Sequence, residues 1–370
     1  LLERIPHDIL KMTKKIIFSS GGTGGHIFPA INLMKHFSNK GYDVLLVTDA
    51  KGSIFLKNYT HFRSCIINTD TPSNKNILKK LFSFIVIFFS IVKSIMVLKK
   101  EKPNLIIGFG GYVSFPISFS TRFYNIPLVI YENNLVLGRT NKILLPLSKK
   151  LLLGTKIPVN FPAQYKSKAY QVGNILREEI VNYTIIEKKN NSKNFSILVL
   201  GGSQGAEIFG EIIPSTINML KDAGYMIEIK QQCIKQQKNS LIEFYKKNNI
   251  KSNIFDFTNN ILDLIKFSDL AISRCGASTT AELVNTQTPF IAIPYPYSMD
   301  NHQYLNAKYY EDKGCCWIME QDKFNSTNLF NLIIEILEDK KKLANMRESM
   351  KKNDSKDVYD KVENAIKEFI

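Results

Sequence analysis

Short apolar runs alternate with segments of helical spacing along the first half of the chain. The runs are rich in branched side chains and comprise Ile16–Ser19, Val44–Val47, Leu105–Ile107, Leu128–Tyr131 and Leu151–Gly154. Apolar strands joined by helical crossovers are typical of a parallel sheet that helices cover on both faces. We therefore predict an α/β domain built on a parallel sheet.

The same pattern starts again after a polar stretch at residues 185–195, which predicts an exposed loop near a domain junction. The second set of runs comprises Ser196–Leu200, Met226–Lys230, Ile254–Phe257, Leu270–Ser273 and Phe290–Ile293. Each set opens with a strand, a glycine-rich turn and a helix, which indicates two Rossmann-like domains that face each other across a cleft. We place these domains at residues 13–176 and 177–354.

The last segment of the chain has the spacing of an amphipathic helix. One helical face carries its apolar positions, which are Val358, Val362, Ala365, Ile366 and Phe369. Asp354 or Ser355 supplies a capping residue at its start. We expect a helix over residues 355–370 that packs back on the first domain.

Residues 81–98 depart from the pattern because they are almost all apolar. A spanning helix needs ~20 apolar residues, but Lys93 and the strand pattern that resumes at residue 104 disfavour a membrane span. We favour an interfacial helix on an anionic membrane over simple burial. Its basic rim consists of Lys75, Lys79, Lys80, Lys99, Lys100 and Lys102.

Composition narrows the remaining choices. The 370 residues carry a formal net charge of +16, which suits an anionic membrane or a phosphate-bearing substrate but also follows from a chain rich in lysine throughout. No aromatic and basic motif typical of nucleic-acid binding is present, so we expect no nucleic-acid partner. The five cysteines form no C-x-x-C pair, which indicates a reducing compartment without structural zinc. Residues 1–11 lack the features of a secretory signal, and we expect them to be an extension with no role in the fold.

The first glycine-rich turn, "GGTGG" at residues 21–25, opens a helix and predicts a site for an anion. It lacks the dinucleotide fingerprint, because residue 27 is Ile27 where a third glycine would stand, and it lacks the Gly-Lys-Ser/Thr of a P-loop. Asp49 follows the second strand, where a dehydrogenase would hold a ribose. A dinucleotide-dependent oxidoreductase is therefore the weakest of our alternatives.

Most of the other polar clusters also follow predicted strands, where ligands bind in open α/β sheets. They are "GFGGYVS" (108–114), "YENN" (131–134), "GRTNK" (138–142), "VGNILR" (172–177), "GGSQGAE" (201–207), "SRCGASTTAEL" (273–283) and "PYPYSMDNHQYLNA" (294–307). In this order, and over essentially residues 13–370, they resemble the MurG family of N-acetylglucosaminyltransferases. The resemblance implies a GT-B fold and an inverting transfer without a catalytic metal or other cofactor.

The resemblance also implies the substrates and the location. The family moves GlcNAc from UDP-GlcNAc to the C4 hydroxyl of the muramoyl sugar of lipid I, which gives lipid II for peptidoglycan. It works as a peripheral protein on the cytoplasmic face of the bacterial inner membrane. Other GT-B enzymes, namely a glycolipid transferase or a UDP-GlcNAc 2-epimerase, remain an alternative.

Donor-binding residues follow from the motifs that match the family. In the second domain, the amides at a helix start would bind the diphosphate. Glu282 would accept hydrogen bonds from the ribose hydroxyls, and Gln303 would hold the sugar. Ser203 matches a phosphate contact, Arg177 a charged donor contact, and Thr258 a backbone contact to uracil. Asn134 and the first glycine turn would close over the donor sugar. The remaining members of this set are Thr23, Gly24, Gly25, Ala277, Ser278, Thr279 and Thr280.

The transfer needs a base for the acceptor hydroxyl and groups that absorb the charge of the leaving UDP. His26 is our candidate base, with the alternative that it orients the loop or binds the acceptor's diphosphate. Tyr112 and Glu132 are weaker candidates for proton transfer or acceptor contacts. The chain departs from the family pattern at Ile175 and Cys275 and in "YENN", and none of these departures removes a charged contact.

Overall fold

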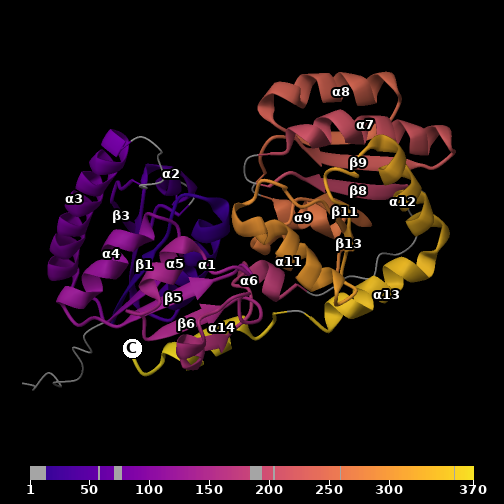
Figure 1. Ribbon diagram of the computed structural model, residues 1–370. Helices are drawn as coiled ribbons and strands as arrows, with labels where there is room; N and C mark the ends of the chain where they lie inside the picture. The colour runs from indigo at the N-terminus through magenta and orange to yellow at the C-terminus, as the bar shows by residue number, and fades with distance from the viewer. Residues whose placement is uncertain are drawn as a thin grey trace, which may run out of the picture.

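The computed structural model describes residues 14–56, 59–70, 77–183, 194–202, 205–258, 260–353 and 355–370. Each half of the chain forms a parallel sheet that helices cover on both faces (Figure 1). The first sheet has the order β3-β2-β1-β4-β5-β6-β7 and the second has the order β10-β9-β8-β11-β12-β13. The α/β class and the two-sheet GT-B arrangement predicted from the sequence are therefore confirmed.

The strands of the first sheet are β1 (Lys15–Ser19), β2 (Asp43–Thr48), β3 (Arg63–Ile66), β4 (Leu105–Gly108), β5 (Leu128–Glu132), β6 (Lys150–Leu153) and β7 (Ala169–Gln171). Those of the second are β8 (Phe195–Leu200), β9 (Ile227–Gln232), β10 (Lys251–Phe255), β11 (Leu270–Ser273), β12 (Phe290–Ala292) and β13 (Trp317–Ile318). The strand order reverses beside β1 and beside β8, where crevices for ligands form in such sheets. Both glycine-rich turns follow these two strands.

The helices of the first half are α1 (Gly24–Asn39), α2 (Ala50–Ser53), α3 (Ile77–Glu101), α4 (Ser114–Ser120), α5 (Arg139–Leu144) and α6 (Glu178–Val181). Those of the second are α7 (Glu207–Asp222), α8 (Lys238–Lys247), α9 (Ile261–Lys266), α10 (Ala277–Asn285), α11 (His302–Glu311), α12 (Ser326–Glu338), α13 (Lys340–Lys351) and α14 (Val358–Ile366). The junction predicted at residues 185–195 lies largely outside the described residues, as do residues 1–13.

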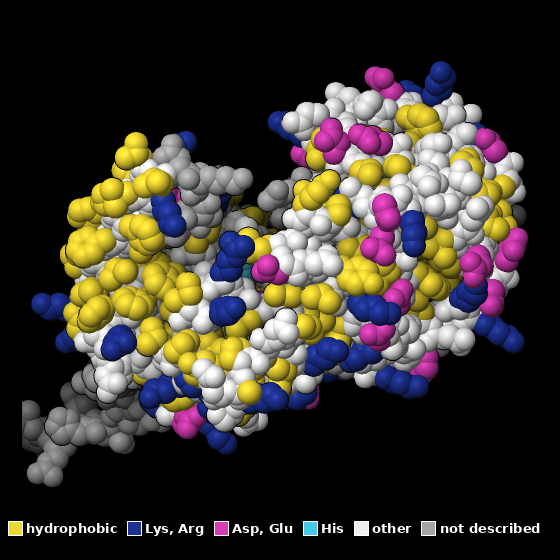
Figure 2. Space-filling model, viewed as in Figure 1, with side chains coloured by type: hydrophobic (Ala, Val, Ile, Leu, Met, Phe, Trp, Pro, Cys, Tyr) yellow, Lys and Arg dark blue, Asp and Glu magenta, His cyan; other side chains and the backbone are white. Residues whose placement is uncertain are grey.

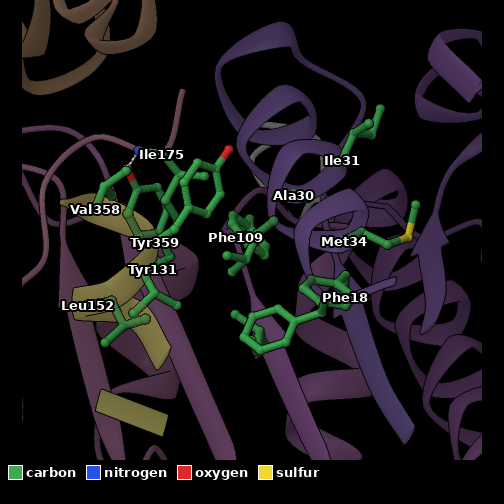
Figure 3. Packing of buried hydrophobic residues seen from close by; sticks show 14 of the residues in the cluster. Phe18, Ala30, Ile31, Met34, Phe109, Tyr131, Leu152, Ile175, Val358 and Tyr359 are labelled. Atoms are coloured by element: carbon green, nitrogen blue, oxygen red, sulfur yellow. Dashed lines mark hydrogen bonds between the residues drawn. The ribbon is translucent and has the colours of Figure 1, made fainter. Parts of the chain in front are cut away.

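The last helix, α14, lies against the first sheet although its sequence follows the second domain (Figure 1). Val358 and Tyr359 pack in the same cluster as Tyr131 and Ile175 (Figure 3). The Tyr359 hydroxyl donates to the Leu176 carbonyl at 2.5 Å, which ties α14 to the segment between the domains.

The predicted start of this last helix was wrong. Asp357 is its N-cap residue, so the helix begins three residues later than expected. The backbone amide of Ser355 donates instead to the Asn285 side chain at 2.9 Å, which holds it in the connection to the second domain. The other proposed cap, Asp354, lies outside the described residues.

Helix α3 buries its small polar side and exposes its apolar side. Ser83, Ser90 and Ser94 are buried, and their hydroxyls donate to groups of the first domain and to the preceding turn of the helix. Lys93, which disfavoured a span in the sequence, donates to the Ile66 carbonyl at 2.8 Å. Large apolar side chains cover the outer side (Figure 2). By length and composition, α3 is the one helix among the described residues that could cross a membrane.

Candidate active site

The first glycine-rich turn is packed against its neighbours at the switch point of the first sheet. A Cβ added to Gly22 would lie 2.5 Å from Asp49 Oδ1, and one added to Gly21 would lie 3.3 Å from the Cα of Gly111. Gly111 itself has a φ of +73°, a conformation that side chains rarely adopt. These glycines are therefore required by close backbone approach.

Helix α1 begins within the glycine run, and its first amides have no partner inside the helix. Thr23 is the N-cap residue and makes no side-chain capping bond, and Gly24 and Gly25 are the first two helical residues. A Cβ added to Gly25 would meet nothing within 4 Å, so the space beside it is open. The Gly25 carbonyl accepts a hydrogen bond from Asn133 Nδ2 at 2.9 Å, which joins this turn to the "YENN" loop. The start of α1 can thus receive an anionic or hydroxylated ligand.

His26 lies in the first turn of α1, against the turn that follows β4. Its Cε1 atom would lie 3.4 Å from a Cβ added to Gly110. Burial lowers the pKa of His26 below its usual value of 6.5. The Glu132 carboxylate and a hydrogen bond to the Phe109 backbone oppose this effect, whereas His302 of the second domain adds to it. The imidazole is therefore neutral at pH 7 and able to accept a proton.

Glu132 is buried, and the donors of its own loop saturate its carboxylate. Oε1 accepts from the amide and the side chain of Asn134, both at 3.1 Å. Oε2 accepts from the Gly138 amide at 2.8 Å and from Asn141 Nδ2 at 3.0 Å. A carboxylate with four such bonds organises the loop, so the geometry favours a positioning role for Glu132 over proton transfer.

Asn134 stands where the two domains meet. Its Nδ2 atom donates to Glu132 Oε1 at 3.1 Å and to Asn133 Oδ1 at 3.0 Å. Its Oδ1 atom accepts from Asn306 Nδ2 of α11 at 3.1 Å. The backbone amide of the next residue, Leu135, donates to Asn306 Oδ1 at 3.2 Å. The first-domain loop is thus held directly against the second domain.

Tyr112, the third candidate for proton transfer, is partly exposed beside the first glycine turn. Burial and a hydrogen bond to Asp49 raise the pKa of the Tyr112 phenol above its usual value of 10. Asp49 also accepts from the Gly52 amide at 2.7 Å and so caps α2. The phenol stays protonated near pH 7 and is a hydrogen-bond donor there. Asp49 already has two partners, which disfavours the ribose role that the oxidoreductase alternative requires.

In the second domain, α10 begins at Ala277, as the sequence predicted, and its N-cap Gly276 offers no side chain. The amides of Ala277, Ser278 and Thr279 therefore start the helix without an intrahelical acceptor. The Ser278 hydroxyl is buried and has no hydrogen-bond partner in the described structure. These groups suit a bound phosphate. Thr280 does not join them, because its amide and its hydroxyl both donate to the Gly276 carbonyl.

Arg177, at the junction between the two domains, pairs with Glu282 of α10. Arg177 Nη2 lies 3.4 Å from Glu282 Oε1, and the guanidinium carbon lies 5.9 Å from the centre of the Phe28 ring. Burial raises the pKa of the Glu282 carboxyl, and Arg177 partly offsets this effect. Two residues that the sequence assigned separately to donor binding are thus brought together beside the start of α10.

Gln303 lies in the first turn of α11, and backbone amides fix its orientation. Its Oε1 atom accepts from the Cys275 amide at 3.1 Å and from the Tyr295 amide at 3.0 Å. Because the oxygen is identified by two donors, the NH₂ end of the side chain is the end available as a donor. Such a donor suits a sugar hydroxyl or carbonyl oxygen.

Two further predicted residues give less information. The Thr258 hydroxyl accepts from the Asn260 amide at 3.0 Å, which shapes the loop after β10 and leaves the Thr258 backbone to act as predicted. Ser203 lies outside the described residues. The start of its loop is fixed by Gln232, whose side chain accepts from the Gly201 amide and donates to the Gly202 carbonyl, both at 3.0 Å.

Sequence reasoning missed two residues that organise the site, Arg274 and Asn306. The buried Arg274 guanidinium donates to the carbonyls of Ile293 and Pro294, both at 3.2 Å, and to Gln321 Oε1 at 2.6 Å. A charged residue directly after an apolar strand, within "SRCGAS", was a signal for Arg274. Asn306 follows Gln303 by three positions, which places both on one face of α11.

A cavity of about 470 Å³ lies away from these residues, between α11, β13 and α12. The space between the domains that is lined in part by Asn133, Asn174 and Asn306 is closed and has no room for a water molecule. No group of three or more His, Cys, Asp or Glu side chains suited to a metal ion occurs in the described part of the chain. Transfer without a metal stays a prediction.

Comparisons with known proteins agree on one family. The glycosyltransferase family 28 N-terminal domain matches residues 16–152, and the family 28 C-terminal domain matches residues 196–362. A UDP-N-acetylglucosamine–N-acetylmuramyl-(pentapeptide) pyrophosphoryl-undecaprenol N-acetylglucosamine transferase of Pelagibacter ubique is 36% identical, with 92% of this chain and 94% of that protein covered. Its counterpart in Rickettsia bellii is 34% identical, with 96% of this chain and 100% of that protein covered.

A solved structure agrees with these relatives. The crystal structure of Acinetobacter baumannii MurG superposes with a TM-score of 0.78 at 25% identity, over 96% of this chain and 99% of that one. The two matched family ranges include both glycine-rich turns. The chain belongs to the MurG family of UDP-N-acetylglucosamine–N-acetylmuramyl-(pentapeptide) pyrophosphoryl-undecaprenol N-acetylglucosamine transferases, within glycosyltransferase family 28.

Proposed function

We propose that this chain transfers GlcNAc from UDP-GlcNAc to the C4 hydroxyl of the muramoyl sugar of lipid I and so forms lipid II. Membership of the family supports the reaction. The observation that carries it is a chain of hydrogen bonds between the two domains. Asn133 donates to the Gly25 carbonyl at the start of α1, and Asn306 donates both to Asn134 and to the Cys275 carbonyl just before α10. This arrangement presents donor-binding groups of one domain to acceptor-side groups of the other.

The donor binds mainly to the second domain. The first amides of α10 and the Ser278 hydroxyl hold the diphosphate, and Glu282 accepts from the ribose hydroxyls. The NH₂ group of Gln303 and the remaining acceptor position on Asn134 hold the sugar. Binding the sugar from both sides of the cleft orients its anomeric carbon toward the acceptor.

The chemical step is an inverting displacement. The acceptor's C4 oxygen forms a bond to the anomeric carbon, and the bond from that carbon to the diphosphate oxygen breaks. The proton of the hydroxyl passes to the neutral His26 imidazole, and UDP leaves with the electron pair. The helix amides and Arg177 stabilise the negative charge that grows on UDP, and the step requires no metal.

The acceptor is delivered at a membrane surface by α3. Its exposed side carries Phe82, Phe88 and Phe89, while the lysines near its ends supply positive charge toward anionic lipids. Of the predicted rim, Lys75 lies outside the described residues. The apolar face and the charge support a peripheral position on the cytoplasmic face of the inner membrane, with lipid I held in the same leaflet.

The test is product analysis with radiolabelled UDP-GlcNAc and lipid I in anionic vesicles. We expect lipid-linked GlcNAc and free UDP in equal amounts, with activity retained in the presence of a chelator. Transfer to other glycolipids but not to lipid I would support a different GT-B transferase. Formation of the UDP-linked 2-epimer of GlcNAc without an acceptor would indicate an epimerase. Thermal stabilisation by NAD but not by UDP would refute the proposal.

A further inference from the structure

Asn306 is a buried residue of α11 that has no assigned role in binding or chemistry. Its side chain is 3% exposed. Nδ2 donates to Asn134 Oδ1 at 3.1 Å and to the Cys275 carbonyl at 3.2 Å, and Oδ1 accepts from the Leu135 amide at 3.2 Å. Two of these partners belong to the first domain and one belongs to the second. A single amide group thus joins both sides of the cleft.

These bonds determine what Asn134 can offer to a ligand. Both hydrogens of its NH₂ group are used by Glu132 and Asn133, and Asn306 occupies one acceptor position on its oxygen. An amide oxygen accepts two hydrogen bonds, so one acceptor position remains. If Asn306 were removed, the Asn134 oxygen would lose its only donor among the described residues, and its orientation would be less restricted.

The same helix also holds the donor side of the cleft. Gln303, one turn before Asn306, accepts from the Cys275 amide at 3.1 Å, and Asn306 donates to the carbonyl of that same residue at 3.2 Å. Both backbone groups of Cys275 are therefore fixed by α11, directly before α10 begins. A shift of α11 would move Gln303 and Asn134 together, because Asn306 connects them.

We propose that Asn306 is a positioning residue that orients Asn134 toward the donor sugar and sets the spacing between Asn134 and Gln303. The inference rests on the proposed function and goes beyond it, since it assigns sugar recognition to a contact between the domains. UDP alone binds to α10 and the second glycine turn and does not require this contact. The sugar of UDP-GlcNAc does require it.

The test is a double-mutant cycle with Asn306→Ala, Asn134→Ala and the double variant in the full chain. Calorimetry measures the dissociation constants of UDP and UDP-GlcNAc for each protein. We expect N306A to weaken UDP-GlcNAc binding roughly tenfold, the size expected for losing one neutral hydrogen bond. UDP binding should change less than about twofold, and N306A should add little once Asn134 is already alanine.

A matched control is Asn285→Ala on α10. Asn285 is also a buried asparagine that joins two segments, since it accepts from the Ser355 amide and donates to the Ala281 carbonyl, both at 2.9 Å. N285A should lower the melting temperature by an amount similar to N306A without changing the ratio of UDP to UDP-GlcNAc affinity. If N306A does not fold, the near-isosteric Asn306→Asp keeps the acceptor for Leu135 but loses both donors, and it should show the same selective loss.

Equal weakening of UDP and UDP-GlcNAc by N306A would overturn the inference, as would additive effects of the two substitutions or an unchanged affinity. These outcomes differ from a failure of the proposed function. If the wild-type chain neither binds UDP-GlcNAc nor transfers GlcNAc, the function is wrong. If the wild-type chain does both and N306A matches it, only the role of Asn306 is wrong.

Discussion

The double substitution Phe88→Ser and Phe89→Ser tests whether α3 docks on a membrane. Both rings are exposed, at 62% and 65%, and lie 5.8 Å apart between centroids. With ~200 Å² per ring, these fractions leave ~250 Å² of apolar surface to bury, or ~6 kcal/mol at 25 cal/mol per Å². Insertion to the depth of the headgroups buries about half of this area, so we expect a loss of ~3 kcal/mol, or about a hundredfold in partitioning.

Vesicle flotation measures this loss directly, with anionic and neutral vesicles compared at low and high salt. Anionic vesicles should bind the wild-type chain more strongly, and salt should weaken binding because it screens the lysines around α3. The double variant should keep the wild-type melting temperature, because neither ring contributes to the buried core. Its transfer to lipid I in vesicles should fall, whereas its affinity for UDP-GlcNAc should not change.

A matched control is Phe267→Ser in the second domain, whose ring is 66% exposed. That change removes about half as much apolar area as the double variant, ~130 Å² at ~200 Å² per ring, at a site away from α3, and we expect vesicle binding to stay at the wild-type level. Undiminished binding of the double variant would refute the reasoning, and so would an equal loss in the Phe267 control.

Three further predictions concern the site. His26→Ala should lower kcat ~10²–10⁴-fold with little change in UDP-GlcNAc affinity, and equal losses in both would assign His26 to binding. Because burial lowers the pKa of His26 below its usual 6.5 in the free chain, the acid limb of kcat/KM should lie below pH 6.5 and disappear in His26→Gln. The unfolded chain takes up this proton more readily, so the His26 contribution also lowers stability as the pH falls below 6.5. Arg274→Met leaves the Ile293 and Pro294 carbonyls without their buried donor, at ~1–3 kcal/mol each, so urea unfolding should show a loss of ~2–6 kcal/mol. An unchanged unfolding curve would contradict the role assigned to Arg274.

The fold was largely predictable because its central strands are buried on both faces. Ile16–Ser19 and Leu270–Ser273 lie in apolar runs whose bounds agree closely with β1 and β11. The missed strands β3 and β7 are the two edge strands of the first sheet, and β13 is an edge strand of the second sheet with two residues. Such strands carry no continuous apolar signal. The strand expected at Ile254–Phe257 lies at Lys251–Phe255, since its first half is exposed and polar.

The buried side of α3 could have been predicted from its serines. Ser83, Ser90 and Ser94 are separated by seven and four positions, which places them on one helical face. The sequence analysis weighed the total hydrophobicity of this stretch and did not use that spacing. Because these serines share one helical face, that face packs on the first domain and the large apolar side chains lie on the exposed face.

The contacts between residues far apart in the sequence could not have been predicted. Asn134 and Asn306 lie 172 positions apart, and Arg177 and Glu282 lie 105 positions apart. No local pattern relates such residues, because their meeting depends on how the two sheets are placed relative to each other. Motifs identified which loops surround the ligand, whereas the pairing of individual side chains required the structure.

The structure also separates the three candidates for the base. A base must be unprotonated near pH 7 and must keep an acceptor atom for the incoming proton. The Glu132 carboxylate is unsuited because four donors from its own loop already occupy it. The Tyr112 phenol is unsuited because its raised pKa keeps it protonated. His26 has a lowered pKa, and its ring lies against the glycine turn that follows β4. Of the three, it is therefore the residue at which a proton from a substrate held between the domains can be received.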